Sequence, residues 1–477
     1  MTGASLAGCG EEDPAADESN VSEEASVEAE CVAFQTEHED DEVFAGKVDV
    51  DCGPAFHHYA AKIETRAPAA GETVRIANFN VYHLGDDQGR YKNYDTLAEM
   101  MNGWDVVSAV ELMTPNSESV RHNRVVRQQA EVGQVDEKVR IIIPGYLELL
   151  KSLMKKDPSW SLVMTPIPLQ EPGASHAELT GFYYRKSRVQ LVESELCGEE
   201  ACVASIEALQ DANGLNRDQQ PQIARRPFDA GFKAGTFDFS LVGVHIRFRA
   251  PESGTAPFQG VDRLTAFRLL ETQIVANWIG HELRDARDKD VVWAGDFNVE
   301  FTKMSTVGTF TPGGEPREEV TYEASWNQAL AGFDGAKVFV TREATSLSTS
   351  GLVSNYDHLI YSPTLTKECI TEQEAHAFNF TNAETMPSYA EFLSGDGVDK
   401  YAEAFVAEQA ACHTFKGGGR IKRVEPCLTA DALADVKSTI MGIADKAGRG
   451  EFSVHTPLVS DHIPVLVECK LPTSDDD

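Results

Sequence analysis

The stretch Trp293–Glu300, WAGDFNVE, places a carboxylate and a carboxamide two positions apart at the end of an apolar run. The five residues VVWAG, 291–295, predict a buried strand that ends at Asp296. Side chains two positions apart on extended backbone project from the same face. We therefore expect Asp296 and Asn298 to share one pocket.

Five other segments end an apolar strand with a polar residue of the same kinds. They are ANFNV with Asn80, SAVEL with Glu111, VGVHIR with His245, NYDHLIY with Asp357, and VSDHIP with Asp461 and His462. Each segment alone is weak evidence for a catalytic site. An isolated Glu at the end of a strand is usually a surface residue, and a His in a strand is more often a buried residue bonded to backbone. Together, hard oxygen ligands and imidazoles indicate metal-assisted hydrolysis.

The segments NFNV, SAVEL, GVH, GDFN, YDHLIY and SDHIPV occur in the order found in the endonuclease/exonuclease/phosphatase superfamily, which shares the fold of deoxyribonuclease I. The resemblance covers about residues 73–470 without the insertions, and GDFN and SDHIP are its most specific parts. It implies an α/β fold, a four-layered α/β/β/α sandwich of two mixed sheets with a helical insertion. The site is then expected at the sheet edge where the strand ends converge.

The resemblance also implies a role for each oxygen ligand. Glu111 matches the main metal ligand, with Asn80 and Asp461 near it, so that the cation would sit on a phosphate oxygen. Asp296 and Asn298 would orient the attacking water and the phosphate, and the family sometimes credits the former as general base. The cofactor implied is Mg²⁺, with Mn²⁺ or Ca²⁺ as alternatives.

His245 and His462 resemble the two imidazoles that flank the phosphate in this family, and each needs a carboxylate to fix its tautomer. Asp357 matches the partner of His462. For His245 the candidate partner is Glu178, in the segment HAELTGFYYRKSRV. His358 alternates to the opposite face from Asp357, and we expect it to be structural.

Substrate contacts are harder to read from the sequence. Arg247 and Arg249 share the face of His245 by period two, and we expect them to contact phosphate. The basic runs at 121–129, 224–228 and 416–423 are more typical of solvated faces.

The charge of the 477-residue chain is strongly acidic, at a formal −34. Residues 11–51 alone carry sixteen Asp or Glu against the single Lys47. A polyanionic substrate would have to be held by local basic groups or metal ions rather than by the overall field. The pairing of His245 with Glu178 favours the deoxyribonuclease branch, so we expect DNA as substrate and a monomeric endonuclease. The alternatives are a phosphodiesterase or phosphatase for phospholipid head groups or sugar or inositol phosphates, and a non-catalytic binding scaffold.

The segment Leu6–Cys9 resembles the lipobox at which bacterial lipoproteins are lipidated on cysteine. It lacks a preceding basic and apolar region, so either the start is trimmed or the match is accidental. We expect Cys9 to carry lipid, which would be the chain's only membrane contact. This predicts an extracytoplasmic protein, secreted or lipid-anchored at the bacterial surface or in the periplasm.

Eight cysteines remain if Cys9 is lipidated, which allows up to four disulfides. One local bridge is expected between Cys31 and Cys52. Cys197 and Cys202 are too far apart for a redox CxxC pair and have no nearby His in the sequence, which argues against zinc.

Composition and periodicity divide the chain into three parts. Residues 1–70 are expected to form an acidic, disordered tether, and residues 71–471 the catalytic domain, followed by an acidic tail at 472–477. Within the domain, residues from about 365 to 450 predict a helical insertion. No run of 18 apolar residues occurs, so no membrane-spanning helix is predicted.

Overall fold

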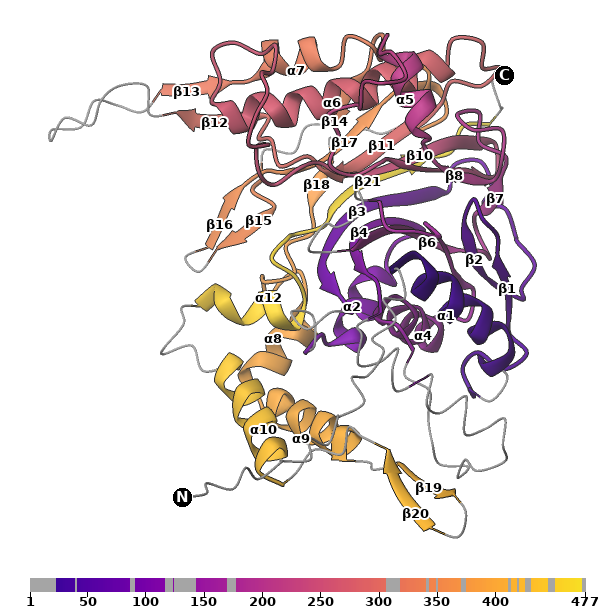
Figure 1. Cartoon of the computed structure of the whole chain (residues 1–477), viewed down its shortest axis with the longest axis vertical. Helices are drawn as coiled ribbons and strands as arrows, with labels where there is room; N and C mark the ends of the chain where they lie inside the picture. The colour runs from indigo at the N-terminus through magenta and orange to yellow at the C-terminus, as the bar shows by residue number, and fades with distance from the viewer. Residues whose placement is uncertain are drawn as a thin grey trace, which may run out of the picture.

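The structure is a computed structural model that describes residues 23–38, 41–85, 91–115, 123, 143–169, 177–305, 318–339, 343–348, 351–369, 375–410, 413–417, 420–424, 430–444 and 451–473. Two mixed β-sheets pack face to face, with helices on both outer faces (Figure 1). The predicted α/β sandwich is therefore confirmed.

The first sheet has eight strands, in the order β1 (Val48–Cys52), β2 (His57–Ala61), β5 (Trp160–Met164), β6 (Glu178–Arg185), β4 (Val106–Met113), β3 (Thr73–Leu84), β21 (Val465–Lys470) and β18 (His376–Ala377). Its centre is the parallel pair β3 and β4, and β6 and β21 flank this pair in antiparallel register. The first two strands of the chain therefore form one edge of the sheet, and the last strand, β21, lies next to the central pair.

The second sheet has seven strands. Six follow the order β14 (Lys337–Phe339), β17 (Asp357–Tyr361), β11 (Val291–Asp296), β10 (Phe237–His245), β9 (Phe228–Ala234) and β7 (Gln190–Val192), and β8 (Ala201–Val203) also pairs with β9. Strands β10 and β11 are parallel, so His245 and Asp296 end neighbouring strands at the same edge.

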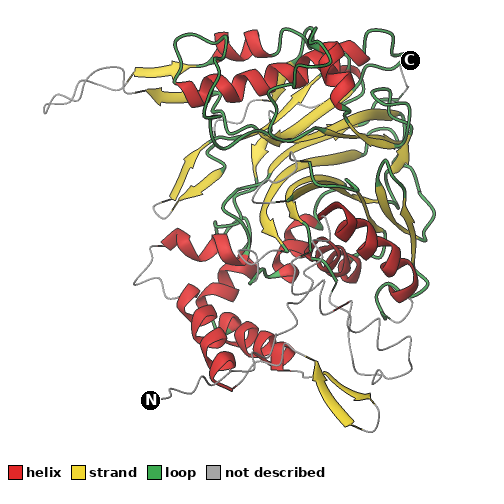
Figure 2. Ribbon diagram, in the orientation of Figure 1, coloured by secondary structure: helices red, strands yellow, loops and turns green. Residues whose placement is uncertain are grey.

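The alternation of side chains along each strand builds three apolar layers. Ile76 and Phe182 from the first sheet meet Phe232 and Leu241 from the second in the core between the sheets. Helices α1 (Glu23–Glu37), α2 (Tyr94–Met101) and α4 (Gly145–Lys156) cover the outer face of the first sheet, and α5 (Ile206–Ala212), α6 (Arg263–Glu282) and α7 (Glu323–Ala329) cover that of the second (Figure 2). Asp262 caps the start of helix α6, because its side chain accepts from the backbone N–H of Thr265.

The N-terminal region differs from the tether expected for residues 1–70. Residues 23–37 form α1, and the hairpin β1–β2 extends the first sheet. Val27, Cys31 and Phe34 have helical spacing, and they form an apolar face of α1 that is buried against the core. The sequence analysis missed this face because acidic residues surround it. The expected disulfide between Cys31 and Cys52 is present. Cys9 lies outside the described residues.

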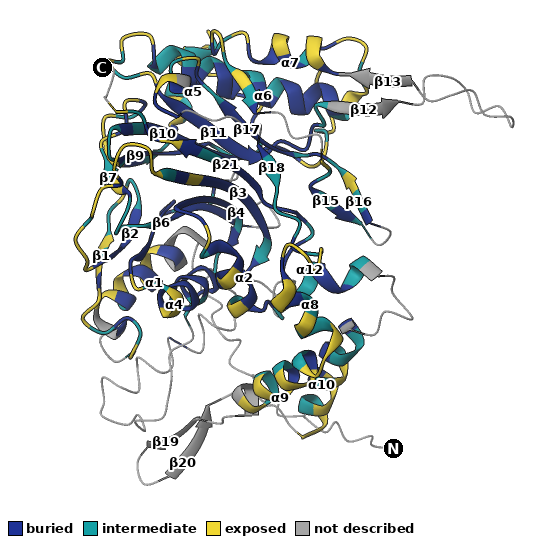
Figure 3. Cartoon of the chain, turned by 180° about the vertical axis from the view of Figure 1, so that it is seen from behind, coloured by how far each residue is buried: buried dark blue, intermediate teal, exposed yellow. Residues whose placement is uncertain are grey.

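The predicted insertion lies between β17 and β21. It contains α8 (Pro387–Ser394), α9 (Gly397–Ala410), the hairpin β19 (His413–Gly417) and β20 (Arg420–Val424), and α10 (Ala430–Ala444). The short helices η3 (Glu451–Val454) and α12 (His455–Leu458) follow it and lead to β21. Helices α9 and α10 pack through a small core of their own, made of Val398, Ala402, Val436 and Ile440. The buried faces of these helices turn toward each other, below the sandwich (Figure 3).

A disulfide between Cys369 and Cys469 joins the start of the insertion to β21. Two further hairpins, β12 (Thr302–Ser305) with β13 (Glu318–Thr321) and β15 (Ser346–Ser348) with β16 (Gly351–Ser354), project from the second half of the chain. Among the described helices, none combines the length and the apolar character that crossing a bilayer requires.

Candidate active site

Strand register places three predicted site residues side by side. His245 is the partner of Asp296 in the parallel pair β10 and β11, and Asp296 is the partner of Asp357 in the antiparallel pair β11 and β17. Cross-strand partners on one face have Cβ atoms about 4.5–5.5 Å apart. The pairing of β10, β11 and β17 therefore fixes the spacing of these residues.

The facing sheet contributes Asn80 from β3 and Glu111 from β4. Asn80 Nδ2 donates to Glu111 Oε1 at 2.8 Å and to Asp296 Oδ2 at 3.1 Å. Its Oδ1 accepts from the backbone N–H of Tyr82 at 2.9 Å. Asn80, fully buried, thus bridges the two carboxylates with its amide nitrogen, whereas the sequence suggested an oxygen ligand beside Glu111.

Several residues of the candidate active site have left-handed backbone conformations. Among the described residues other than glycine, positive φ occurs at Tyr82 (48°), His83 (50°), Glu111 (60°) and Asn298 (52°). The register shifts between Asn80 and Leu84 and between Ala109 and Leu112, so both strands are irregular where they reach the site. Each such residue costs on the order of 1 kcal/mol, and strain of this kind concentrates at functional sites.

His462 is oriented by Asp357. Its Nδ1 lies 2.6 Å from Asp357 Oδ2, and the other carboxylate oxygen accepts from Asn78 Nδ2 at 3.1 Å. Its Nε2 lies 3.5 Å from Asp296 Oδ2. Burial, the largest single influence, lowers the pKa of His462, but the surrounding carboxylates, Asp357 first, outweigh it and raise the pKa well above its usual value. The imidazole therefore holds its proton at neutral pH.

His245 is oriented by Glu178, as predicted, since its Nδ1 lies 2.7 Å from Glu178 Oε2. Its Nε2 lies 3.8 Å from Glu111 Oε1 and 3.7 Å from Asp296 Oδ2. Glu178 is itself held by Arg225, whose Nη2 donates to Oε1 at 2.5 Å.

The charged groups around His245 shift one another's pKa values. Burial and Arg225 lower the pKa of His245, but Glu178 and Asp296 outweigh them and raise it. Burial alone would raise the pKa of Glu178, but His245 and Arg225 together lower it to about 2. Glu178 therefore stays ionised at physiological pH, between the His245 ring and the Arg225 guanidinium.

Asp296 and Asn298 are in direct contact at the end of β11. The backbone N–H of Asn298 donates to Asp296 Oδ1 at 2.8 Å, which leaves Oδ2 directed at the two imidazoles. Asn298 Nδ2 donates to the carbonyl of Ile246 at 2.9 Å, and Arg268 Nη1 donates to the carbonyl of Asn298 at 2.6 Å. These bonds fix the turn that follows β11.

The oxygen donors fit a divalent cation. Asp461 Oδ1 is buried and has no hydrogen-bond partner, and burial with the nearby Glu111 charge raises the pKa of Asp461 to about 6, despite His462 acting in the opposite direction. A hard cation between Asp461 and Glu111 would offset this uncompensated charge. Carboxylate oxygens are the ligands that Mg²⁺, Mn²⁺ and Ca²⁺ prefer.

The two arginines expected to contact phosphate are placed differently. Arg247 Nε donates to Glu271 Oε2 at 2.6 Å and its Nη2 donates to the carbonyl of Gln222 at 2.7 Å, so its charge is balanced within the fold. Arg249 is exposed on the loop that follows β10. His358 is on the opposite face, as expected: its Nε2 lies 2.8 Å from the carbonyl oxygen of Val299, and burial lowers its pKa to about 4.

Three residues of the site escaped the sequence reading. Asn78 is two positions from Asn80 on the same strand, a spacing that could have indicated it. His83 approaches Glu111 through its backbone N–H, at 3.1 Å from Oε2, and through Nε2 at 3.7 Å. Arg225 belongs to a basic run read as a solvated face, and no local signal connects it with Glu178.

The comparisons with known proteins show similarity of fold only. No family model matches the chain, and no curated protein matches it. Among solved structures, an endonuclease/exonuclease/phosphatase family protein from Bacteroides thetaiotaomicron is 12% identical with a TM-score of 0.38, over 83% of this chain and 97% of that one. A beta toxin from Staphylococcus aureus is 10% identical, with a TM-score of 0.35 over 82% and 98%. A humanized D. rerio TDP2 is 13% identical, with a TM-score of 0.34 over 83% and 98%.

Proposed function

We propose that this chain is a divalent-metal-dependent phosphodiester hydrolase of the endonuclease/exonuclease/phosphatase type, and that it cleaves DNA as an endonuclease. One observation carries the proposal. Asp296 Oδ2 lies 3.7 Å from His245 Nε2 and 3.5 Å from His462 Nε2, and it shares Asn80 with Glu111. Two carboxylate-oriented imidazoles and a set of hard oxygen donors thus face one point.

The arrangement suits in-line attack of water on a phosphodiester. Asp296 Oδ2 lies within 3.7 Å of the Nε2 atoms of both imidazoles, and it would accept a proton from the attacking water. His245 and His462, whose pKa values are raised by the surrounding carboxylates, would donate hydrogen bonds to phosphoryl oxygens and a proton to the leaving oxygen.

Glu111 and Asp461 would hold the metal ion, with Asn80 keeping Glu111 in place. When bound, the cation supplies positive charge against a phosphate oxygen in the transition state. The ion proposed is Mg²⁺, with Mn²⁺ or Ca²⁺ as substitutes. Asn298, held by Ile246 and Arg268, would position the phosphate rather than take part in proton transfer.

A second substrate class has one observation in its favour. Phe248, three residues beyond His245, is 61% exposed, and its carbonyl oxygen accepts from Arg268, which also holds Asn298. An exposed aromatic ring near the pocket would stack on a nucleotide base or insert among lipid chains. A phosphodiesterase acting on phospholipid head groups is therefore the alternative to the nuclease.

Two disulfides suggest that the chain folds outside the cytoplasm, because such bonds form and persist in oxidising compartments. We extend this to a monomeric protein that is secreted or anchored through lipid on Cys9. Labelling of the expressed chain with a fatty-acid analogue, compared with Cys9→Ser, tests the anchor.

Plasmid nicking decides between the substrate classes. We expect supercoiled plasmid to be nicked with Mg²⁺, and the reaction to stop with chelator and with His462→Ala. The matched control is His281→Ala, a histidine at the end of α6 outside the site. Hydrolysis of sphingomyelin vesicles or inositol phosphates with intact plasmid would favour the alternative. Inactivity on DNA, RNA, lipid and bis-p-nitrophenyl phosphate with all three metals would refute a hydrolase.

A further inference from the structure

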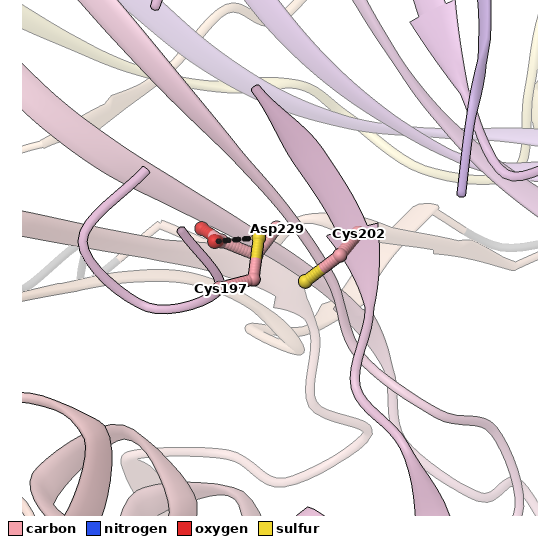
Figure 4. A group of neighbouring side chains, drawn as sticks. All are labelled: Cys197, Cys202 and Asp229. Carbon is pink, nitrogen blue, oxygen red and sulfur yellow. Dashed lines mark hydrogen bonds between the residues drawn. The ribbon is translucent and has the colours of Figure 1, made fainter. Parts of the chain in front are cut away.

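A second group of metal-ligating side chains lies away from the candidate active site. The ligand atoms of Cys197, Cys202 and Asp229 all lie within 4.8 Å of one another (Figure 4). They occupy the opposite face of the second sheet from His245. On β10, Leu241 faces the core between the sheets, while Val242 and Val244 face the helices, and Asp229 is paired with Val242.

Strand pairing and one tight turn bring the three residues together. Cys202 on β8 is the register partner of Asp229 on β9, so the two side chains leave the sheet on the same side. Cys197 comes from the turn before β8, which is closed by hydrogen bonds from Gly198 N to Ser194 O and from Ser194 N to Glu199 O, both 2.8 Å. Figure 4 shows the Cys197 side chain directed at the Asp229 carboxylate.

Asp229 is fully buried and only partly satisfied. Its Oδ2 accepts from Ser194 Oγ at 2.5 Å and from Cys197 Sγ at 3.5 Å, whereas its Oδ1 is buried without a hydrogen-bond partner. A buried carboxylate with an unpaired oxygen is costly, and a cation at this position would offset that cost.

The distances suit a tetrahedral ion. With zinc–sulfur bonds of about 2.3 Å and zinc–oxygen bonds of about 2.1 Å, neighbouring sulfur and oxygen ligands are about 3.6 Å apart. The Sγ atom of Cys197 is 3.5 Å from Asp229 Oδ2. Both cysteines are half-buried, so an ion can reach them and a water can occupy the fourth position.

We propose that Cys197, Cys202 and Asp229 form a binding site for Zn²⁺ or a similar thiophilic divalent cation. Two thiolates and a carboxylate are the donors that such an ion prefers over Mg²⁺ or Ca²⁺. Binding joins the metal to two sulfurs and one oxygen and releases the two thiol protons, with no change of oxidation state. The ion would clamp the 194–203 segment to β9. The proposal is independent of the phosphodiesterase.

The sequence alone argued against zinc here, because the pair has the wrong spacing and no neighbouring His. The third ligand comes from Asp229, which strand pairing supplies from 27 positions further along than Cys202. The competing state is a disulfide between the two cysteines, as found for the other two described pairs.

The test uses the full chain, purified without chelator. Titration with Co²⁺ should give a thiolate-to-metal charge-transfer band in the near ultraviolet that saturates at one equivalent and is displaced by Zn²⁺. The oxygen ligands of the active site contribute nothing to that band. Cys202→Ser should abolish the band, and Asp229→Asn should weaken Zn²⁺ binding at least tenfold. Asp218→Asn, at an exposed position, is the matched control and should bind as the parent does.

A thermal readout covers variants that fold poorly. Zn²⁺ should raise the melting temperature of the parent and of Asp218→Asn, but not of Cys202→Ser. A disulfide joining Cys197 and Cys202 in the non-reducing peptide map of the purified chain would overturn the proposal. Free thiols that give no charge-transfer band, or an Asp229→Asn variant with unchanged affinity, would do the same.

Discussion

Asn80 donates a hydrogen bond of 3.1 Å to Asp296 across the gap between the two sheets, although the two residues are 216 positions apart in the chain. The same amide nitrogen reaches Glu111 on its own sheet. The proposed metal ligand Glu111 and the proposed proton acceptor Asp296 therefore lie on different sheets and are aligned by the packing between them.

Replacing Asn80 should uncouple these groups. Asn80→Ala leaves Glu111 and Asp296 without a shared donor, and we expect it to lower the free energy of unfolding by about 1–3 kcal/mol. Asn80→Asp should cost more without metal, because it adds a third carboxylate. Added Mg²⁺ should then restore more stability to Asn80→Asp than to Asn80→Ala. Chemical denaturation with and without Mg²⁺ measures both effects, and equal responses of the two variants would contradict the proposed role of Glu111.

The two imidazoles should each matter for turnover. His245→Ala and His462→Ala should lower turnover by about 10²- to 10⁴-fold, since each removes a positioned acid or base. Circular dichroism should show the same secondary structure as the parent. Their effects should also combine less than additively in the double variant, because both act on one phosphate. A loss below tenfold in either single variant would remove that histidine from the mechanism.

Arg225 should act on His245 through Glu178. Its charge lowers the pKa of His245, so Arg225→Gln should raise that pKa further and move the histidine-dependent limb of the pH–rate profile to higher pH. Arg225→Lys keeps the charge and should restore much of the parent profile. Arg217→Gln, an exposed residue, is the control. An unshifted profile with uniformly reduced activity would mean that Arg225 serves stability alone.

Glu178 should make stability depend on pH in a defined window. Its pKa is about 2 in the folded chain against a usual 4.5, so the folded state binds fewer protons between these values. Its contribution is therefore present above pH 4.5 and is lost as the pH falls toward 2. Glu178→Gln should remove part of this slope. Urea denaturation of both proteins at pH 6, 4 and 3 should show the difference in stability narrowing as the pH falls.

The two disulfides should differ in their contribution to stability. They close loops with sequence separations of 21 and 100 residues. Loop entropy predicts stabilisation by about 3 kcal/mol for Cys31–Cys52 and about 4.7 kcal/mol for Cys369–Cys469. The double serine variant at 369 and 469 should therefore melt at a lower temperature than the variant at 31 and 52. The reverse order would show that native packing, rather than loop closure, dominates.

The sequence predicted those parts of the site that local pattern encodes. The apolar run before Asp296 predicted the strand, and the resemblance carried by the order of motifs implied the facing sheets. The sequence did not predict the left-handed backbone at His83 and Glu111, because no residue pattern in β3 or β4 indicates a bulge there.

Long-range pairing explains the remaining differences. Arg247 was expected to contact the phosphate, because it lies two positions from His245 on the same face. Its guanidinium instead donates a hydrogen bond to Glu271 of α6. The helix at 23–37 was hidden by its acidic residues, since its apolar stripe is stabilised only by packing against the first sheet. In both cases the deciding partner lies on a distant element.

The Cys369–Cys469 bond has a consequence for how the molecule would survive cleavage. A protease that cuts once anywhere between these two cysteines produces two fragments that remain one covalent molecule. The C-terminal piece keeps β21 paired with β3, and a cut before residue 461 leaves His462 beside Asp357. Such a nicked form would run as intact protein on a non-reducing gel and would separate only after reduction.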